Sequence, residues 1–294
     1  MREIRGVITA MATAFATDGA LDLDAARRLA RHLISSGSHG VVVAGTTGES
    51  PTLSDDEKLR LLEAVLEEVG EEALVICGTG SNDTRHACEL TAAACAAGAH
   101  GVLVVTPYYN KPNPAGLRAH FAAVARAAGG TPVVLYNIPS RCVVNLPPDF
   151  LAELAAAIEN VVAVKQANND DLAPIEGLAV LAGNDEIFER TLALGGSGGI
   201  LVASHVVGAE MRAIWDAHLA GDEARAGELD AELAPVYEAM AVTANPIPVK
   251  TALEMMGVIA GHLRLPMVPA DAEQRGVVRG ALESRGLLSA AGAA

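Results

Sequence analysis

The sequence has little of several features that define other protein classes. Its 294 residues contain only four cysteines, with no C-x-x-C pair, so we expect reduced thiols in a cytoplasmic protein rather than a disulfide framework. The formal net charge of −15 excludes general nucleic-acid binding, which needs a basic face. No apolar run approaches the length of a membrane span, and the first residues, MREIRG, lack the apolar core of a signal peptide.

Metal and nucleophilic-serine motifs are also missing. The eight histidines show no H-x-H or H-E-x-x-H spacing, so no metal is expected. The run Gly195–Gly199 matches G-x-S-x-G, but it stands after a helix-like segment and before a strand-like one. That order is the reverse of the one a nucleophilic serine requires, and we reject the match. We expect neither a metal nor an organic cofactor.

What the chain does contain is a repeated alternation of strand-like and helix-like segments. Eight β-branched, strand-like runs are present, at 6–10, 40–44, 74–77, 101–106, 133–137, 161–165, 178–182 and 199–203. Alanine- and leucine-rich segments of helical spacing separate them, including 23–35, 55–68, 84–97, 114–128 and 147–157. Eight such units predict an α/β fold, a (β/α)₈ TIM barrel. An open, doubly wound sheet is the alternative, but the Gly-rich phosphate turn usual after its first strand is absent.

Local signals mark the ends of these helices and a further helical region. Ser54 and Glu57 form a capping box, and Pro114 and Pro147 suit first-turn positions. Gly70 and Gly98 stand where helices should stop. Three more helix-like segments follow, at about 222–241, 247–260 and 272–287. We expect a catalytic barrel domain over residues 1–220 and a three-helix appendage over 221–294, with residues 289–294 frayed.

Lysine is scarce, and one of the four lysines stands in an apolar run. Lys165 ends Val161-Val162-Ala163-Val164-Lys165, which predicts a strand buried on both faces. Desolvation favours the neutral amine, and a neutral amine attacks carbonyl carbons to give a Schiff base. The alternative is a strand-end lysine that reaches water or pairs with a carboxylate. Lys58, Lys111 and Lys250 look ordinary by comparison.

Unusual polar residues gather where the predicted strands end, which is where barrel enzymes place their active sites. The chain shows Gly45-Thr46-Thr47-Gly48-Glu49 after the second strand, Thr106–Asn110 after the fourth, Tyr136–Arg141 after the fifth and Gly183-Asn184-Asp185 after the seventh. The backbone N–H groups and hydroxyls of the loop Gly45–Gly48 could bind a small carboxylate. Tyr136 could transfer a proton, and Arg141 could bind a carboxylate through two parallel hydrogen bonds. Each also has a plain structural interpretation: a glycine turn, a core tyrosine and a surface arginine.

Taken together, these motifs resemble the dihydrodipicolinate synthase and N-acetylneuraminate lyase family of Schiff-base-forming barrels. The likeness extends over nearly the whole chain, through Gly45–Glu49, Thr106–Asn110, Tyr136–Arg141, Lys165, Asn245–Lys250 and Leu263–Pro266. Three motifs resemble those of the synthase branch: Gly-Thr-Thr-Gly-Glu, Tyr-Asn-Ile-Pro-Ser-Arg and Asn-Pro-Ile-Pro-Val-Lys. That branch condenses pyruvate with L-aspartate 4-semialdehyde to 4-hydroxy-tetrahydrodipicolinate, in lysine and diaminopimelate biosynthesis.

The resemblance implies a role for each site residue. Lys165 would form a covalent imine with pyruvate, without any cofactor. Tyr136, Thr46 and Tyr109 would form a proton relay, with Tyr109 supplied by a neighbouring subunit of a homotetramer. The resemblance implies that Thr47 holds the pyruvate carboxylate and Arg141 the carboxylate of the second substrate. It also implies that Gly183 and Ile200 line the pyruvate pocket.

The sequence also shows departures from the family pattern, leaves two alternative functions open and carries one expectation about regulation. Cys142 and Gln166 depart from the usual threonine and acidic residue of the family, which leaves the chemistry intact. A sibling pyruvate-dependent aldolase acting on a sugar acid or another 2-keto acid is the alternative enzyme, and a non-catalytic barrel is the alternative class. In lysine-inhibited relatives an intersubunit cleft carries a histidine and a glutamate where this chain has Lys58 and His86, so the resemblance implies weak inhibition by lysine.

Overall fold

A closed barrel of parallel strands forms the centre of the protein, in a computed structural model that describes residues 3–288. The strands are β1 (Gly6–Ala10), β2 (Gly40–Val43), β3 (Leu74–Gly78), β4 (Gly101–Val105), β5 (Val133–Asn137), β6 (Val161–Gln166), β7 (Ala179–Ala182) and β8 (Gly198–Leu201). Each pairs with the next in sequence, and β8 closes on β1 with Ile8 opposite Ile200. The predicted barrel is confirmed, and the open sheet was wrong.

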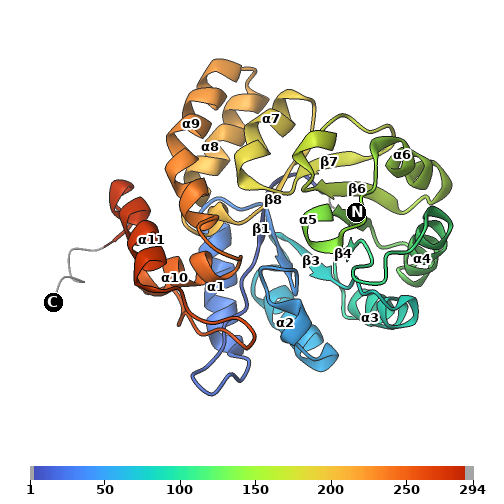
Figure 1. The fold of residues 1–294 in the computed structure, drawn as a ribbon, viewed down its shortest axis with the longest axis horizontal. Coiled ribbons are helices and arrows are strands. Elements are labelled where there is room, and N and C mark those ends of the chain that lie inside the picture. The colour runs from blue at the N-terminus through green and yellow to red at the C-terminus, as the bar shows by residue number, and fades with distance from the viewer. Residues whose placement is uncertain (1–2, 289–294) are drawn as a thin grey trace.

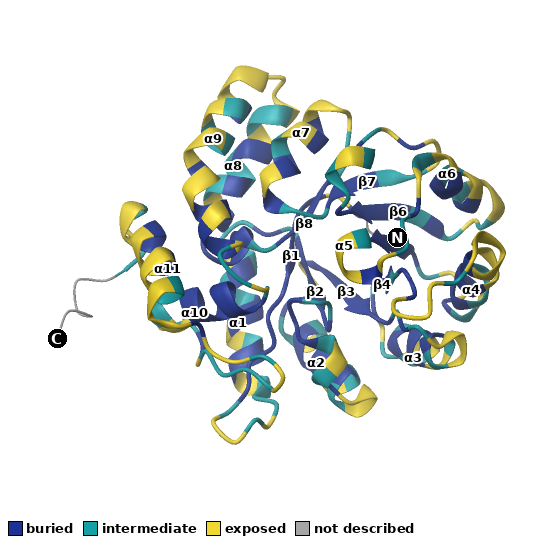
Figure 2. Ribbon diagram, in the orientation of Figure 1, coloured by how far each residue is buried: buried dark blue, intermediate teal, exposed yellow. Residues whose placement is uncertain are grey.

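Helices surround the barrel and cover its outer face (Figure 1). They are α1 (Leu23–Ser35), α2 (Asp55–Val69), α3 (Thr84–Ala96), α4 (Pro114–Ala127), α6 (Pro148–Ala157), α7 (Phe188–Ala193) and α8 (Gly208–Leu219). The short helix α5 (Pro139–Cys142) instead follows β5 at the end of the barrel. Figure 2 shows buried strands inside and helices whose outer faces are exposed. This follows from the sequence, because apolar strands are buried on both sides while amphipathic helices bury one stripe.

The predicted helix signals mostly occur as expected. The capping box of Ser54 and Glu57 opens α2, and Pro114 is the first residue of α4. Gly70 caps the end of α2, and Gly98 follows α3 with a φ of +95°. Pro147 is one residue outside its helix, because Pro148 takes the first helical position.

Three strands end earlier than the sequence predicted, while β3 and β6 each extend one residue further. Ala44 and Thr106 lie outside β2 and β4, and Ala203 belongs to the 3₁₀ helix η4 (Ala203–His205). Non-glycine residues with positive φ lie in the segments after β2, β4 and β5: Ala44, Glu49, Tyr109, Lys111 and Val143. Such conformations cost of order 1–3 kcal/mol each and cluster where function constrains the backbone. The rim loops are therefore held in specific conformations.

The chain continues after the barrel into α9 (Glu223–Met240), α10 (Ile247–Met255) and α11 (Ala272–Ser284). Helix α9 packs against α7 and α8, and α11 packs against both α9 and α10, drawn orange to red in Figure 1. The expected division at residue 220 falls between α8 and α9, and it stays a prediction. The expected fraying concerns residues 289–294, which lie outside the described part of the chain. Within residues 3–288, every helix is too short or too polar to cross a bilayer.

Candidate active site

Lys165 lies near the carboxyl end of β6, with Tyr136 of β5 as its register partner. Only 4% of the residue is exposed. Burial lowers the pKa of the Lys165 amine to about 8, although the Asp185 carboxylate acts against this shift, and the charge of Arg141 adds to it. A substantial fraction of the amine is therefore neutral near neutral pH, as a nucleophilic lysine requires.

Tyr136 provides a protonated phenol beside this amine. The Lys165 Nζ atom lies 4.5 Å from the centroid of the Tyr136 ring. Burial raises the pKa of Tyr136 to about 12, while the charge of Arg141 and a hydrogen bond with the Thr46 side chain lower it. The phenol therefore stays protonated at neutral pH, and it can donate a proton to an oxygen bound at the amine.

A cavity of about 410 Å³ opens above these two side chains. Its lining contains six of the predicted site residues: Thr46, Thr47, Tyr136, Arg141, Lys165 and Gly183. Thr47 is buried, and its Oγ1 accepts a hydrogen bond of 2.9 Å from Nδ2 of Asn245. Arg141, in α5, is exposed and donates to the Asn245 carbonyl over 3.4 Å. The cavity thus brings hydroxyl groups and a partly exposed guanidinium together with the amine.

Two predicted site residues lie outside this lining. Tyr109 is 87% exposed, has a φ of +72°, and lines neither this cavity nor the larger one described below. Ile200 is fully buried on β8 and packs in the apolar cluster that includes Tyr136. The roles assigned to both residues remain predictions.

Among the lining residues to which the sequence assigned no role, Asp185, Tyr237 and Asn245 carry polar groups into the site. The Asp185 carboxylate accepts hydrogen bonds from the backbone N–H groups of Val202 and Ala203, at 2.8 and 3.0 Å. Burial raises its pKa to about 6, against the effect of these two bonds. Asp185 and Asn245 stand in motifs that the sequence displays, whereas Tyr237 lies in α9, which only the packing of that helix brings to the site.

The expectation that Lys58 and Lys250 are ordinary was wrong. Lys250 is fully buried in α10 and its Nζ donates to Oε1 of Glu49 over 2.6 Å. Lys58 is only 7% exposed and donates to Oδ1 of Asp55 over 3.1 Å. Neither side chain lines the cavity of Lys165. Each has a carboxylate counter-ion at hydrogen-bonding distance, so Lys165 is the better nucleophile.

A larger cavity, of about 750 Å³, lies on the α2 and α3 side of Tyr136. It brings together Lys58 and His86, the two residues expected in the regulatory cleft, and Pro51, Asn82 and Tyr108 also line it. Here Asp55 accepts from Lys58 and, over 2.8 Å, from Nε2 of His86. Burial raises the pKa of Asp55, but the bonds from His86 and Lys58 outweigh it and the net shift is downward.

No group of three or more His, Cys, Asp or Glu side chains within residues 3–288 is arranged to hold a metal ion. A family profile described as the dihydrodipicolinate synthetase family matches residues 3–285. The chain belongs to this family. Family membership confirms the resemblance that the spaced motifs indicated.

Individual relatives cover almost the entire chain. A curated 4-hydroxy-tetrahydrodipicolinate synthase from Symbiobacterium thermophilum is 47% identical over 288 residues, or 96% of this chain and 98% of its own length. A dihydrodipicolinate synthase structure from Cyanidioschyzon merolae with lysine bound has a TM-score of 0.93 at 38% identity, covering 97% and 99% of the two chains. A structure described as the first monomeric dihydrodipicolinate synthase variant has a TM-score of 0.93 at 39% identity, with 97% of each chain covered. Like its dihydrodipicolinate synthetase relatives, the chain is a lyase.

Proposed function

We propose that the chain condenses pyruvate with L-aspartate 4-semialdehyde to form 4-hydroxy-tetrahydrodipicolinate, a step of lysine and diaminopimelate biosynthesis. The relatives carry the name of this activity. The observation that carries the proposal is the buried Lys165 amine, 4.5 Å from the Tyr136 ring in a cavity that Thr47 and Arg141 also line. These groups supply a nucleophile, a proton donor and contacts for two carboxylates.

The first step joins pyruvate to the enzyme. The neutral Lys165 amine attacks the carbonyl carbon of pyruvate, and the carbonyl oxygen becomes the hydroxyl of a carbinolamine. The Tyr136 phenol donates a proton to that hydroxyl, which leaves as water and yields the iminium. This leaves a Tyr136 phenolate, which the hydrogen bond with the Thr46 side chain stabilises and connects to the rest of the relay. The Thr47 hydroxyl holds the pyruvate carboxylate, and no cofactor takes part.

The second step forms the carbon–carbon bond. The Tyr136 phenolate takes a methyl proton, which converts the iminium to an enamine. The terminal carbon of the enamine attacks the aldehyde carbon of the semialdehyde, and the aldehyde oxygen takes a proton from the Tyr136 phenol to become a hydroxyl. The amino group of the adduct then attacks the iminium carbon, closes the ring and displaces Lys165. Arg141 receives the carboxylate of the semialdehyde. In a protein of net charge −15, this guanidinium supplies the local positive charge that an anionic substrate needs.

Tyr109 completes the relay from a neighbouring subunit. Its side chain is 87% exposed and outside the cavity of its own chain, which supports a role in another subunit. The working unit is then at least a dimer, and a homotetramer by family likeness, in the cytoplasm. Two-fold packing would supply one Tyr109 to each of two sites.

Trapping with borohydride tests the proposed chemistry. Borohydride with pyruvate should add one reduced pyruvyl group to Lys165, located by peptide mass spectrometry. Lys165→Met should abolish labelling, while Lys111→Met, in an exposed loop, should leave it unchanged. A coupled assay with a reductase and L-aspartate 4-semialdehyde should show turnover. Labelling at Lys58 or Lys250 instead, or turnover without any label, would refute the mechanism.

A further inference from the structure

The loop that holds both site threonines has a strained backbone at each end. Ala44 precedes Gly45–Gly48 with a φ of +53°, and Glu49 follows it with φ and ψ of 53° and 38°. Left-handed conformations of non-glycine residues persist only where surrounding contacts over-determine them. The contacts that hold this loop therefore bear on the positions of Thr46 and Thr47.

Several of those contacts come from the C-terminal part of the chain. Lys250 Nζ donates to Glu49 Oε1 over 2.6 Å, and the backbone N–H of Arg264 donates to Glu49 Oε2 over 3.0 Å. Asn245 donates to the Thr47 hydroxyl. Both oxygens of the Glu49 carboxylate are thus bound by groups that lie after the barrel in sequence. The loop is tied to this region at Thr47 and at Glu49.

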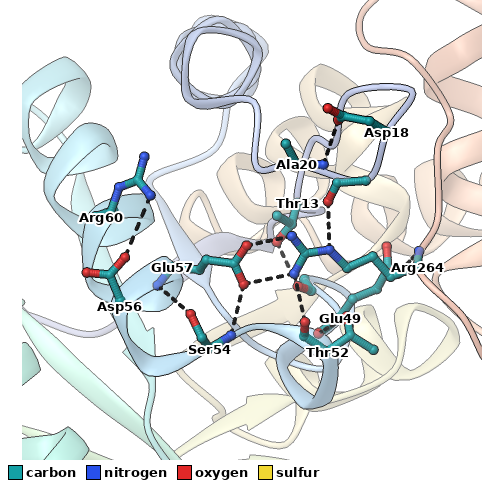
Figure 3. A network of polar contacts seen from close by, with 12 residues as sticks. Thr13, Asp18, Ala20, Glu49, Thr52, Ser54, Asp56, Glu57, Arg60 and Arg264 are labelled. Atoms are coloured by element: carbon teal, nitrogen blue, oxygen red, sulfur yellow. Dashed lines mark hydrogen bonds and ion pairs between the residues drawn. The ribbon is translucent and has the colours of Figure 1, made fainter.

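The guanidinium of Arg264 extends the same attachment to the start of α2. It donates to the Thr52 carbonyl over 2.7 Å and to both carboxylate oxygens of Glu57, over 2.8 and 2.5 Å, as Figure 3 shows. The central carbon of the guanidinium lies 4.3 Å from the centroid of the Phe15 ring, and Lys250 Nζ lies 4.4 Å from the same centroid. The two cations therefore share one aromatic ring beneath the loop.

Burial gives the Glu49–Lys250 ion pair a large desolvation cost. The Glu49 side chain is 2% exposed and that of Lys250 is 0% exposed. The free energy lost on desolvating two buried charges can exceed the free energy gained from their attraction, so the pair need not stabilise the fold. A role in fixing the geometry of the loop accounts for it better. Neither residue lines either cavity around Tyr136. They can affect the reaction only through the loop that Glu49 ends.

We propose that Glu49 and Lys250 are a positioning pair, which uses the C-terminal region to hold the Gly45–Glu49 loop so that Thr46 and Thr47 meet the pyruvate adduct. The inference rests on the proposed function for the identity of that adduct. It assigns the region after the barrel a part in the reaction, because three of its residues bind the loop directly. The pair touches no reacting atom.

The test compares Lys250→Met and the milder Glu49→Gln with Asn160→Ala. Asn160 stands just before β6, at the opposite end of the barrel, and its side chain donates to three backbone carbonyls between the last turn of α4 and β5. Its loss lowers stability without touching the loop. For folded protein of each variant, the pyruvate concentration giving half-maximal borohydride trapping is measured with the melting temperature. Loop variants should need about tenfold more pyruvate or greater. The control should stay within about twofold of wild type at a similar loss of melting temperature.

Hydrogen exchange of residues 44–53 gives a readout that does not depend on the reaction. It should accelerate in the loop variants and not in Asn160→Ala, while β5 and β6 stay protected. Unchanged exchange and unchanged pyruvate dependence in both loop variants would refute the positioning pair, as would an equal defect in the control. A wild-type enzyme that never labels Lys165 would refute the proposed function instead, and exchange would still decide the positioning role.

Discussion

The ammonium of Lys165 and the ring of Tyr136 meet because the two residues are register partners on adjacent parallel strands, β6 and β5. Both side chains point to the barrel interior at the same level. Burial moves their pKa values in opposite directions, to about 8 for the amine and about 12 for the phenol. One register therefore produces a neutral nucleophile next to a protonated acid, and the predictions below depend on it.

The lowered pKa of Lys165 predicts how imine formation depends on pH. With a pKa of about 8, the neutral fraction of the amine rises from about a tenth at pH 7 to about nine tenths at pH 9. Imine formation at low pyruvate should rise accordingly, with a midpoint near pH 8. The Asp185 carboxylate raises the pKa of Lys165, so Asp185→Asn should shift the midpoint to lower pH. Glu186→Gln is the control, and a midpoint above pH 10 in the wild type would contradict this account.

Removing the Tyr136 hydroxyl should slow the reaction while the fold persists. Tyr136→Phe keeps the buried ring but loses the proton donor, so we expect kcat to fall about 10²–10⁴-fold. Tyr108→Phe, which removes a hydroxyl from the larger cavity, should change kcat by less than about threefold. Steady-state kinetics and circular dichroism of both variants check this. Equal rates for Tyr136→Phe and the wild type would exclude the phenol from the relay.

Arg141 should matter for the second substrate and not for the first. Arg141→Met should lower kcat/KM for L-aspartate 4-semialdehyde by about 10–100-fold, the loss expected for a charge-assisted hydrogen bond. Pyruvate trapping should change by less than about threefold, because Arg141 acts on Lys165 only through its charge. Arg118→Met removes an exposed guanidinium of α4 and serves as control. A defect in pyruvate trapping as large as that for the semialdehyde would contradict the assignment.

The exposed Tyr109 predicts an assembly in which subunits share residues. Lys165→Met and Tyr109→Phe should each have little activity alone. A mixture that exchanges subunits should recover about a quarter of wild-type activity, because half of the dimers are mixed and one of their two sites is complete. Light scattering should show at least a dimer. An active monomer at assay concentration, or no recovery on mixing, would show that Tyr109 acts within its own chain or not at all.

The larger cavity predicts little feedback inhibition by L-lysine. Asp55 already accepts hydrogen bonds from Lys58 and His86, and the Lys58 ammonium repels the two ammonium groups of free lysine. Losing one charge-assisted contact costs about 1.5–3 kcal/mol, or one to two decades in affinity. Initial rates across a lysine titration check this. Half-inhibition below about a millimolar, where binding is worth only about −4 kcal/mol, would prove the prediction wrong.

Much of the fold follows from local patterns in the sequence. Apolar β-branched runs and helical spacing predicted eight strands and their intervening helices, because period and propensity act over neighbouring residues. The capping box of Ser54 and Glu57 was also predictable, since both residues lie within one turn. The strand-end rule of barrels then placed Lys165, Tyr136 and Thr46 at one rim without knowledge of any contact.

Contacts between distant segments were not predictable in this way. The Glu49–Lys250 pair joins residues 201 positions apart, and no local pattern links the two. Tyr237 reaches the cavity only because α9 packs against the barrel, and the pKa of Lys165 depends on the depth at which closure buries it. The sequence by itself determined the elements and the chemical groups at their ends, since these depend on local geometry. Only the tertiary structure decided which charges are buried together, because desolvation and pairing depend on all the segments that close around a group.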